Sequence, residues 1–166
     1  MLMNGSKTTT AFQESSAINM SKINIFPMEE KHIPSVLEIE CSCFSVPFKE
    51  NDFKDYLKNP LWHLLVAELD GKIIGYISFM IIYPECDLVN IAVLPEFRGK
   101  GVGQALLHQL IMIADSEELT YIHLEVRRSN TSAINLYTKN GFVIVGESKN
   151  HYSNPTEDAL RMNLTV

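Results

Sequence analysis

Hydrophobic and polar residues follow two different periods along this chain, which predicts that strands and helices alternate from Lys22 onward. Strands are expected where apolar residues alternate with polar ones or run continuously, and helices where they recur every three or four positions. The predicted strands cover residues 23–26, 64–69, 72–82, 88–93, 121–126, 142–145 and 159–164. The predicted helices cover residues 33–41, 53–57, 102–114 and 131–139. This order indicates a single mixed domain of the α/β (α+β) class.

Two dipeptides locate turns between these elements. Asp70-Gly71 separates two apolar runs and is the strongest short signal for a β-hairpin, because both turn positions require a positive φ. Asn140-Gly141 follows the last predicted helix and is typical of a helix end. The run from Tyr76 to Ile82 is almost continuously apolar, which favours a strand buried on both faces.

The length of 166 residues fits one domain, which we assign to residues 22–166. Residues 1–21 are rich in Ser, Thr and Asn, and we expect a disordered tail or a misassigned start, with Met20 as an alternative first residue. They lack the basic start and apolar middle of a secretory signal. Because no run of 18 apolar residues occurs either, we expect a cytoplasmic protein without membrane partners.

Charge and composition limit the classes of molecule that this protein is expected to bind. The formal net charge of −6 gives no counterion release on binding nucleic acid, so DNA and RNA are poor candidates and an amine-bearing partner fits better. The odd number of cysteines (Cys41, Cys43 and Cys86) predicts reduced thiols. The five histidines show no metal-ligand spacing, so we expect no metal site.

The most specific segment is a glycine-rich turn between a strand and a helix. Gly99, Gly101 and Gly103 allow positive φ angles and close approach of the backbone to a ligand. The free amides and the dipole at the start of the next helix attract an anion such as pyrophosphate, and Arg98 and Lys100 add positive charge. The spacing matches neither the dinucleotide fingerprint nor the nucleoside triphosphate loop. A glycine-rich turn without a ligand is the alternative.

These residues carry a resemblance to a known family. Arg98-Gly99-Lys100-Gly101-Val102-Gly103 resembles the Arg/Gln-x-x-Gly-x-Gly/Ala signature of the GCN5-related N-acetyltransferases (GNAT). Downstream segments resemble one subgroup, the ribosomal-protein-alanine N-acetyltransferases (RimI-type), over about residues 22–166. The matching segments are Leu124–Arg127, Ser129-Asn130, Ala133-Ile134, Leu136-Tyr137, Gly141-Phe142, Asn150, Tyr152, Glu157–Ala159 and, in the substrate loop, Cys43–Ser45 with Pro47.

The resemblance implies the GNAT fold, with a sheet splayed between its two central strands, and acetyl-coenzyme A (acetyl-CoA) as co-substrate. The strand Ile91-Ala92-Val93 would pair with the pantetheine arm, and Asn130 would contact the cofactor. The pyrophosphate would be bound by Arg98, Gly99, Lys100, Gly101, Val102, Gly103 and Gln104. A free backbone donor at the splay could polarise the thioester carbonyl, a role worth ~3–4 kcal/mol.

Glu125 is the candidate general base. Alternation along the strand places Glu125 on the same face as Tyr121, His123 and Arg127. A carboxylate at this position either pairs with a cation such as Arg127 or faces a cavity, and the resemblance implies the second role, as catalytic base.

Tyr137 is the other candidate catalytic residue. It shares a helix face with Asn130 and Ile134, and the resemblance places it near the departing sulfur. Because a phenol is a weaker acid than a thiol, we expect it to hydrogen-bond the thiolate rather than donate its proton fully. A tyrosine packed in the core is the alternative.

The expected reaction is direct transfer of the acetyl group to an amine in a ternary complex, since no cysteine has a histidine at a readable spacing. Deprotonating an α-amine at pH 7 costs about 1 kcal/mol and a lysine about 4.6 kcal/mol, which favours a protein N-terminus. The resemblance implies the N-terminal alanine of a small-subunit ribosomal protein. A polyamine or antibiotic N-acetyltransferase and a non-catalytic acyl-CoA-binding module remain alternatives, and the oligomeric state is not readable.

Three positions depart from the subgroup pattern near the expected acceptor groove. His151 stands where a tyrosine is common, Ser153 where a proline is usual and Phe48 where a tryptophan is usual. These changes bear on the identity of the acceptor. His151 could also change its charge near neutral pH and so modify acceptor binding.

Overall fold

The computed structural model describes residues 22–166 as one mixed sheet of seven strands, in the order β1-β2-β3-β4-β5-β7-β6, with four α-helices. The strands are β1 (Asn24–Pro27), β2 (Trp62–Leu69), β3 (Lys72–Ile82), β4 (Glu85–Val93), β5 (Tyr121–Arg127), β6 (Val143–Tyr152) and β7 (Glu157–Thr165). The helices are α1 (Ile33–Cys43), α2 (Glu50–Lys58), α3 (Val102–Ser116) and α4 (Thr131–Lys139). The predicted tail, residues 1–21, lies outside the described residues.

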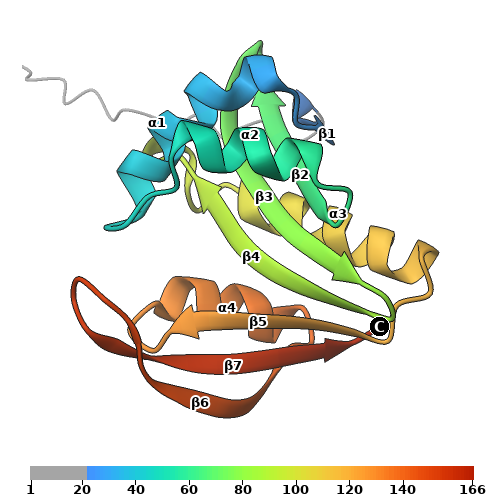
Figure 1. Ribbon diagram of the computed structural model, residues 1–166, viewed down its shortest axis with the longest axis vertical. Helices are drawn as coiled ribbons and strands as arrows, with labels where there is room; N and C mark the ends of the chain where they lie inside the picture. The colour runs from blue at the N-terminus through green and yellow to red at the C-terminus, as the bar shows by residue number, and fades with distance from the viewer. Residues whose placement is uncertain (1–21) are drawn as a thin grey trace, which may run out of the picture.

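The sheet opens between its two central strands. β4 and β5 are parallel but pair only from Glu85–Leu88 to Tyr121–Leu124, although each strand continues beyond that point. Figure 1 shows the result: β1–β4 with α1 and α2 diverge from β5, β7 and β6 with α4, and the two halves meet at the end where the chain terminates. The splayed sheet implied by the resemblance is therefore confirmed.

A β-bulge marks the start of the opening. Leu88 lies opposite Phe79 of β3 and Asn90 lies opposite Ser78, so Val89 between them has no partner in β3. An extra residue of this kind bends a strand and redirects its side chains. The bend in β4 thus coincides with the point where β4 and β5 stop pairing.

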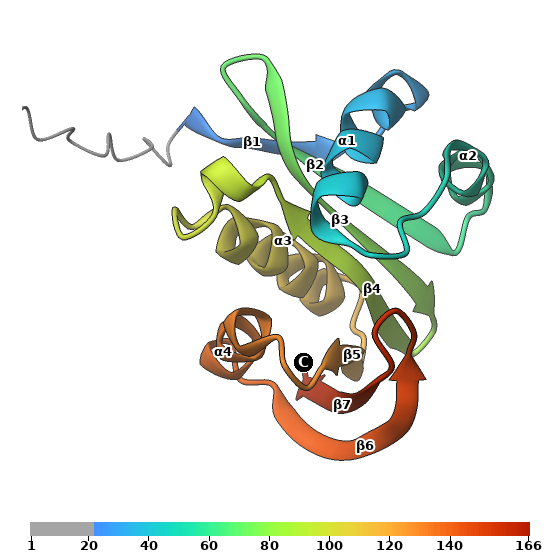
Figure 2. The ribbon, with the colours of Figure 1, turned by 90° about the vertical axis from the view of Figure 1, so that its left-hand side faces the viewer.

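Helices cover both faces of the sheet (Figure 2). Leu106 and Leu110 of α3 are buried with Leu88 and Ile122 in one core cluster. On the opposite face, the cluster beneath α1 and α2 has different members. These include Val36, Ile39, Phe53, Val66, Tyr76 and Ala92. The continuous apolar run of β3 is explained by this arrangement, because β3 supplies residues to both clusters.

The predicted order of elements agrees with the structure, and Asp70 (φ 48°) and Gly71 (φ 82°) form the expected hairpin turn. The largest difference is β6, which continues to Tyr152 although the sequence predicts its end at Val145. Its second part is polar and carries no apolar pattern; β6 is an edge strand with most of its side chains exposed, and its ladder with β7 stabilises it without a buried face. Within residues 22–166, no helix is long and apolar enough to cross a membrane.

Candidate active site

The glycine-rich turn forms the N-terminus of α3. Gly99 (φ 68°) and Gly101 (φ 87°) adopt left-handed conformations, and Gly101 is the N-cap residue of the helix without a capping side chain. The first amides of α3 are therefore left for a ligand. The expectation of a positive φ is wrong for Gly103, because the helix begins at Val102 and Gly103 lies in its first turn.

The two cations of the turn are arranged differently from each other. Arg98 folds back onto the end of β4, where its Nε donates to the carbonyl oxygen of Val93 at 3.0 Å and its guanidinium contacts Cys43 Sγ at 3.1 Å. Lys100 Nζ lies 5.8 Å from the centre of the Phe97 ring. Arg98 is thus held at the end of β4 and Lys100 beside Phe97, and their contribution to binding an anion stays a prediction.

The end of β4 offers backbone groups at the opening. The amide of Leu94 bonds to Ile74 of β3. Because neighbouring residues of a strand point their backbone groups in opposite directions, those of Ile91 and Val93 point away from β3, to the edge that β5 leaves unpaired. The carbonyl of Val93 already accepts Arg98 there. This edge suits pairing with an extended arm such as pantetheine.

Helix α4 faces the same side of the opening. Asn130 is its N-cap residue, and its Oδ1 accepts the amide of Ala133 at 3.1 Å, which leaves the Nδ2 group for a ligand. Tyr137 is only 5% exposed and packs against Phe142, with 5.6 Å between ring centres. Burial, with a smaller contribution from Tyr152, raises the pKa of Tyr137 well above its ordinary value. Tyr137 is therefore a neutral hydrogen-bond donor at physiological pH.

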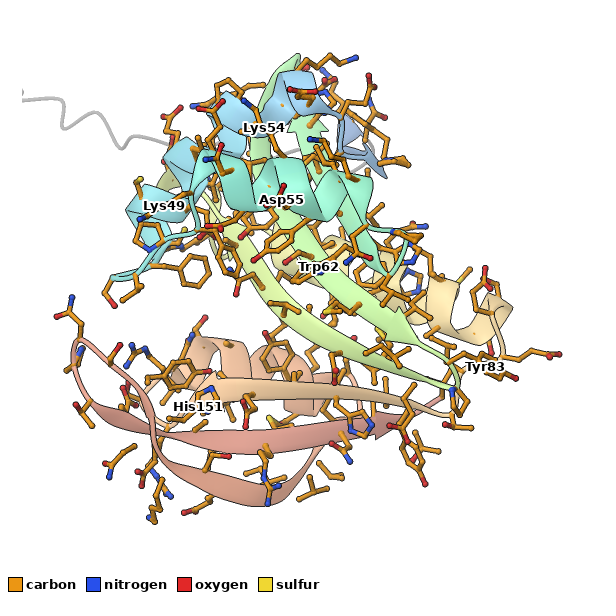
Figure 3. All side chains as sticks on the ribbon, viewed as in Figure 1. Lys49, Lys54, Asp55, Trp62, Tyr83 and His151 are labelled. Atoms are coloured by element: carbon orange, nitrogen blue, oxygen red, sulfur yellow. The ribbon has the colours of Figure 1, made fainter. Side chains whose placement is uncertain are left out.

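A cleft of about 640 Å³ lies at the opening and is lined by β4, β5, β6 and β7. Glu125 of β5 faces this cleft, with 36% of its side chain exposed. Its Oε2 lies 3.0 Å from Nε2 of His151, and its Oε1 accepts the hydroxyl of Ser148 at 2.9 Å. In Figure 3, His151 lies on the β6 side of the space between the two halves.

Arg127 does not pair with Glu125. Its guanidinium forms an ion pair with Glu157 at 3.2 Å, donates to the carbonyls of Ser153 and Pro155, and lies over the Tyr152 ring at 4.4 Å from its centre. Arg127 thus fixes the connection between β6 and β7. Glu125 faces the cleft, and its basic neighbour there is His151 rather than Arg127.

A buried polar cluster, which the sequence pattern does not predict, lies beside the cleft. Glu40 of α1 is fully buried and accepts hydrogen bonds from the Tyr76 hydroxyl, from Nδ2 of Asn90 at 3.2 Å and from the backbone amide of Phe48 at 2.7 Å. Burial raises the pKa of the Glu40 carboxyl above its ordinary value, and the three hydrogen bonds counteract part of that shift. The one sequence signal for this cluster is a charged residue, Glu40, on the apolar face of a predicted helix.

Across residues 22–166, no group of three or more His, Cys, Asp or Glu side chains is placed to hold a metal ion. The three cysteines are all free thiols: Cys41 is exposed, Cys43 is half-buried and Cys86 is buried. Of these, Cys43 contacts Arg98 beside the glycine-rich turn.

Comparison with known proteins agrees with this geometry. The family model described as Acetyltransferase (GNAT) family matches residues 33–142. A Bacillus subtilis (strain 168) protein, provisionally named [ribosomal protein bS18]-alanine N-acetyltransferase, is 36% identical over 147 residues, covering 88% of this chain and 97% of that protein. The [ribosomal protein bS18]-alanine N-acetyltransferase of Escherichia coli (strain K12) is 30% identical over 144 residues, covering 86% and 97%.

A solved structure supports the same relationship. The crystal structure of the ribosomal-protein-S18-alanine N-acetyltransferase from Escherichia coli superimposes with a TM-score of 0.81 at 29% identity. The superposition covers 87% of this chain and 94% of that chain. The match therefore includes both halves of the splayed sheet.

Proposed function

Because this chain belongs to the acetyltransferase (GNAT) family, we propose that it acetylates the N-terminal α-amine of a protein, with the N-terminal alanine of a small-subunit ribosomal protein as the acceptor. The enzyme is an acetyl-CoA-dependent N-acetyltransferase. Similarity to two proteins named for this activity, over more than four fifths of this chain, supports the acceptor. Such an acceptor places the reaction in the cytoplasm.

One observation carries the proposal: the cleft that holds the Glu125 carboxylate opens onto the unpaired edge of β4. The residues that we propose for acetyl-CoA are Ile91, Ala92, Val93, Arg98, Gly99, Lys100, Gly101, Val102, Gly103, Gln104 and Asn130. They belong to β4, to the turn before α3, to α3 and to the start of α4. The amine would enter the cleft and meet the thioester where the sheet opens.

The proposed chemistry is a direct attack. Glu125 takes a proton from the ammonium group, and the nitrogen lone pair attacks the acetyl carbon. The carbon–sulfur bond then breaks to give the coenzyme A thiolate, and the nitrogen loses its second proton to solvent, which yields the neutral amide. The neutral Tyr137 hydroxyl donates a hydrogen bond to that thiolate. Because burial makes this phenol a weaker acid than usual, stabilising the thiolate is easier than protonating it.

The Tyr137→Phe variant should lower kcat roughly tenfold to a hundredfold, because one hydrogen bond to a charged group is worth about 1.5–3 kcal/mol. The KM for acetyl-CoA should change little, since the bond forms only as charge develops on sulfur. Steady-state kinetics with both substrates varied measures the two effects. The exposed Tyr83 provides the control, and Tyr83→Phe should leave both constants unchanged. A normal kcat in Tyr137→Phe would contradict the assignment.

The acceptor class is tested with short peptides that differ only at their first residue. We expect acetylation of free N-termini, with alanine among the best first residues. Lysine-containing peptides with blocked N-termini, spermidine and an aminoglycoside serve as the other acceptors. Transfer only to blocked peptides or to the small amines would overturn the proposed acceptor. Binding of acetyl-CoA without transfer to any amine would identify a non-catalytic module.

A further inference from the structure

The buried cluster described above fixes the orientation of the Asn90 side chain. Nδ2 of Asn90 lies 3.2 Å from Oε1 of Glu40 and 3.1 Å from the Tyr76 hydroxyl oxygen. An asparagine amide can usually be turned by 180° without a visible change, so its orientation has to be deduced from its partners. For Asn90, the two neighbouring groups, Glu40 and Tyr76, determine which way the amide is turned.

The deduction follows from counting protons. A carboxylate accepts hydrogen bonds and donates none, and a tyrosine hydroxyl has a single proton. Tyr76 gives its proton to Glu40, so its oxygen can only accept. Both neighbours of the Asn90 amide on this side are therefore acceptors, and only the NH₂ group satisfies them. The amide oxygen, Oδ1, must point the other way.

Asn90 stands at the entrance to the opening. It is half-buried, follows the bulge residue Val89 directly and lines the same cleft as Glu125. Across the ladder between β3 and β4, the residue opposite Asn90 is Ser78. Its hydroxyl is buried and has no hydrogen-bond partner among the described residues, so it does not satisfy Oδ1.

We propose that Oδ1 of Asn90, held towards the cleft by Glu40 and Tyr76, accepts a hydrogen bond from the first peptide N–H of the acceptor. This inference rests on the proposed peptide acceptor. The peptide N–H suits the role because it stays a donor throughout the reaction, whereas the α-amine must lose a proton to Glu125. Asn90 is then an acceptor-binding residue, and Glu40 is a positioning residue that acts through it.

The same cluster joins the acceptor-binding group to the connection between α1 and α2. The second oxygen of Glu40 accepts the amide of Phe48, which lies in that connection. Phe48 in turn packs edge-on against Phe53 and Tyr56 of α2, with ring centres 6.0 Å and 5.4 Å apart. One buried carboxylate thus sets both the amide of Asn90 and the path of the loop expected to contact the substrate.

The test combines a protein variant with a change in the peptide. Asn90→Leu keeps the branched arrangement of side-chain heavy atoms and lacks Oδ1, and it should raise the KM for an alanine-initiated peptide about tenfold while leaving the KM for acetyl-CoA unchanged. The matched peptide, N-methylated at its first peptide bond, lacks the N–H and should lose about tenfold in kcat/KM with the unmodified enzyme. With Asn90→Leu, N-methylation should cost little more.

Each outcome is decisive. Full additivity of the two losses, or an N-methylated peptide that performs as well as its parent with the unmodified enzyme, would overturn the inference and leave the proposed function intact. The peptide comparison needs no variant, so it decides the question even where Asn90→Leu fails to fold. Ser78→Ala is the control and should leave both KM values unchanged. An unmodified enzyme that acetylates no peptide would overturn the proposed function and this inference together.

Discussion

Replacing Glu125 by glutamine should lower kcat by about a hundredfold or more, the usual contribution of a general base. Glutamine preserves the shape of the side chain, and its oxygen can still accept the hydroxyl of Ser148, as the carboxylate does at 2.9 Å. It cannot take a proton from an ammonium group. The loss should therefore fall on the chemical step, and the dissociation constant of acetyl-CoA, measured by calorimetry, should stay the same.

A matched control separates the base from a general effect of charge. Glu117 is an exposed glutamate at the end of α3, and Glu117→Gln should leave kcat unchanged. A higher pH should rescue Glu125→Gln in part, because the free amine then needs no base. A Glu125→Gln enzyme with normal kcat at neutral pH would show that the amine loses its proton elsewhere in the cleft.

The position of His151 near the acceptor groove can be predicted from the sequence, but its contact with Glu125 cannot. Its departure from the family pattern is visible in the sequence, and so is its expected place near the acceptor groove. The contact of 3.0 Å between His151 and Glu125 cannot be predicted from the sequence, because it depends on β6 continuing to Tyr152 as a polar edge strand. Periodicity detects strands by their apolar residues, and the second part of β6 is polar, whereas the predicted part, Val143–Val145, is apolar although exposed.

The glycine-rich turn was the easier part to predict. Its residues are consecutive, so the helix start and its free amides follow from local rules alone. The opening of the sheet came from the resemblance rather than from periodicity, since nothing in the pattern of residues 88–93 signals the bulge at Val89. The Glu40 cluster could not be predicted, because its members belong to three separate elements and meet only in the folded chain.

Glu40 should also matter for stability. Glu40→Ala removes the acceptor of three hydrogen bonds and leaves the Tyr76 hydroxyl, the Asn90 amide and the Phe48 N–H without it in a buried site. Each unsatisfied buried group costs about 1–3 kcal/mol, and the cavity adds to this. We expect a loss of at least about 3 kcal/mol in the free energy of unfolding, measured by urea denaturation.

The pH dependence of that loss has a definite sign. Burial raises the pKa of Glu40 above its ordinary value of 4.5, so between 4.5 and the raised value the folded protein binds more protons than the unfolded chain. The contribution of Glu40 to stability is then fully present below pH 4.5 and falls as pH rises through the raised pKa. The difference between the unmodified protein and Glu40→Ala should therefore be larger at pH 5 than at pH 8.

Glu38 provides the comparison for both effects, since it lies on the exposed side of the same helix. Glu38→Ala should change the free energy of unfolding by less than about 0.5 kcal/mol at either pH. A Glu40→Ala loss as small as this would mean that the three donors find other partners.

Because the cluster holds the Asn90 amide and the α1–α2 connection together, the same variant, where it still folds, should bind the peptide less tightly while retaining its affinity for acetyl-CoA.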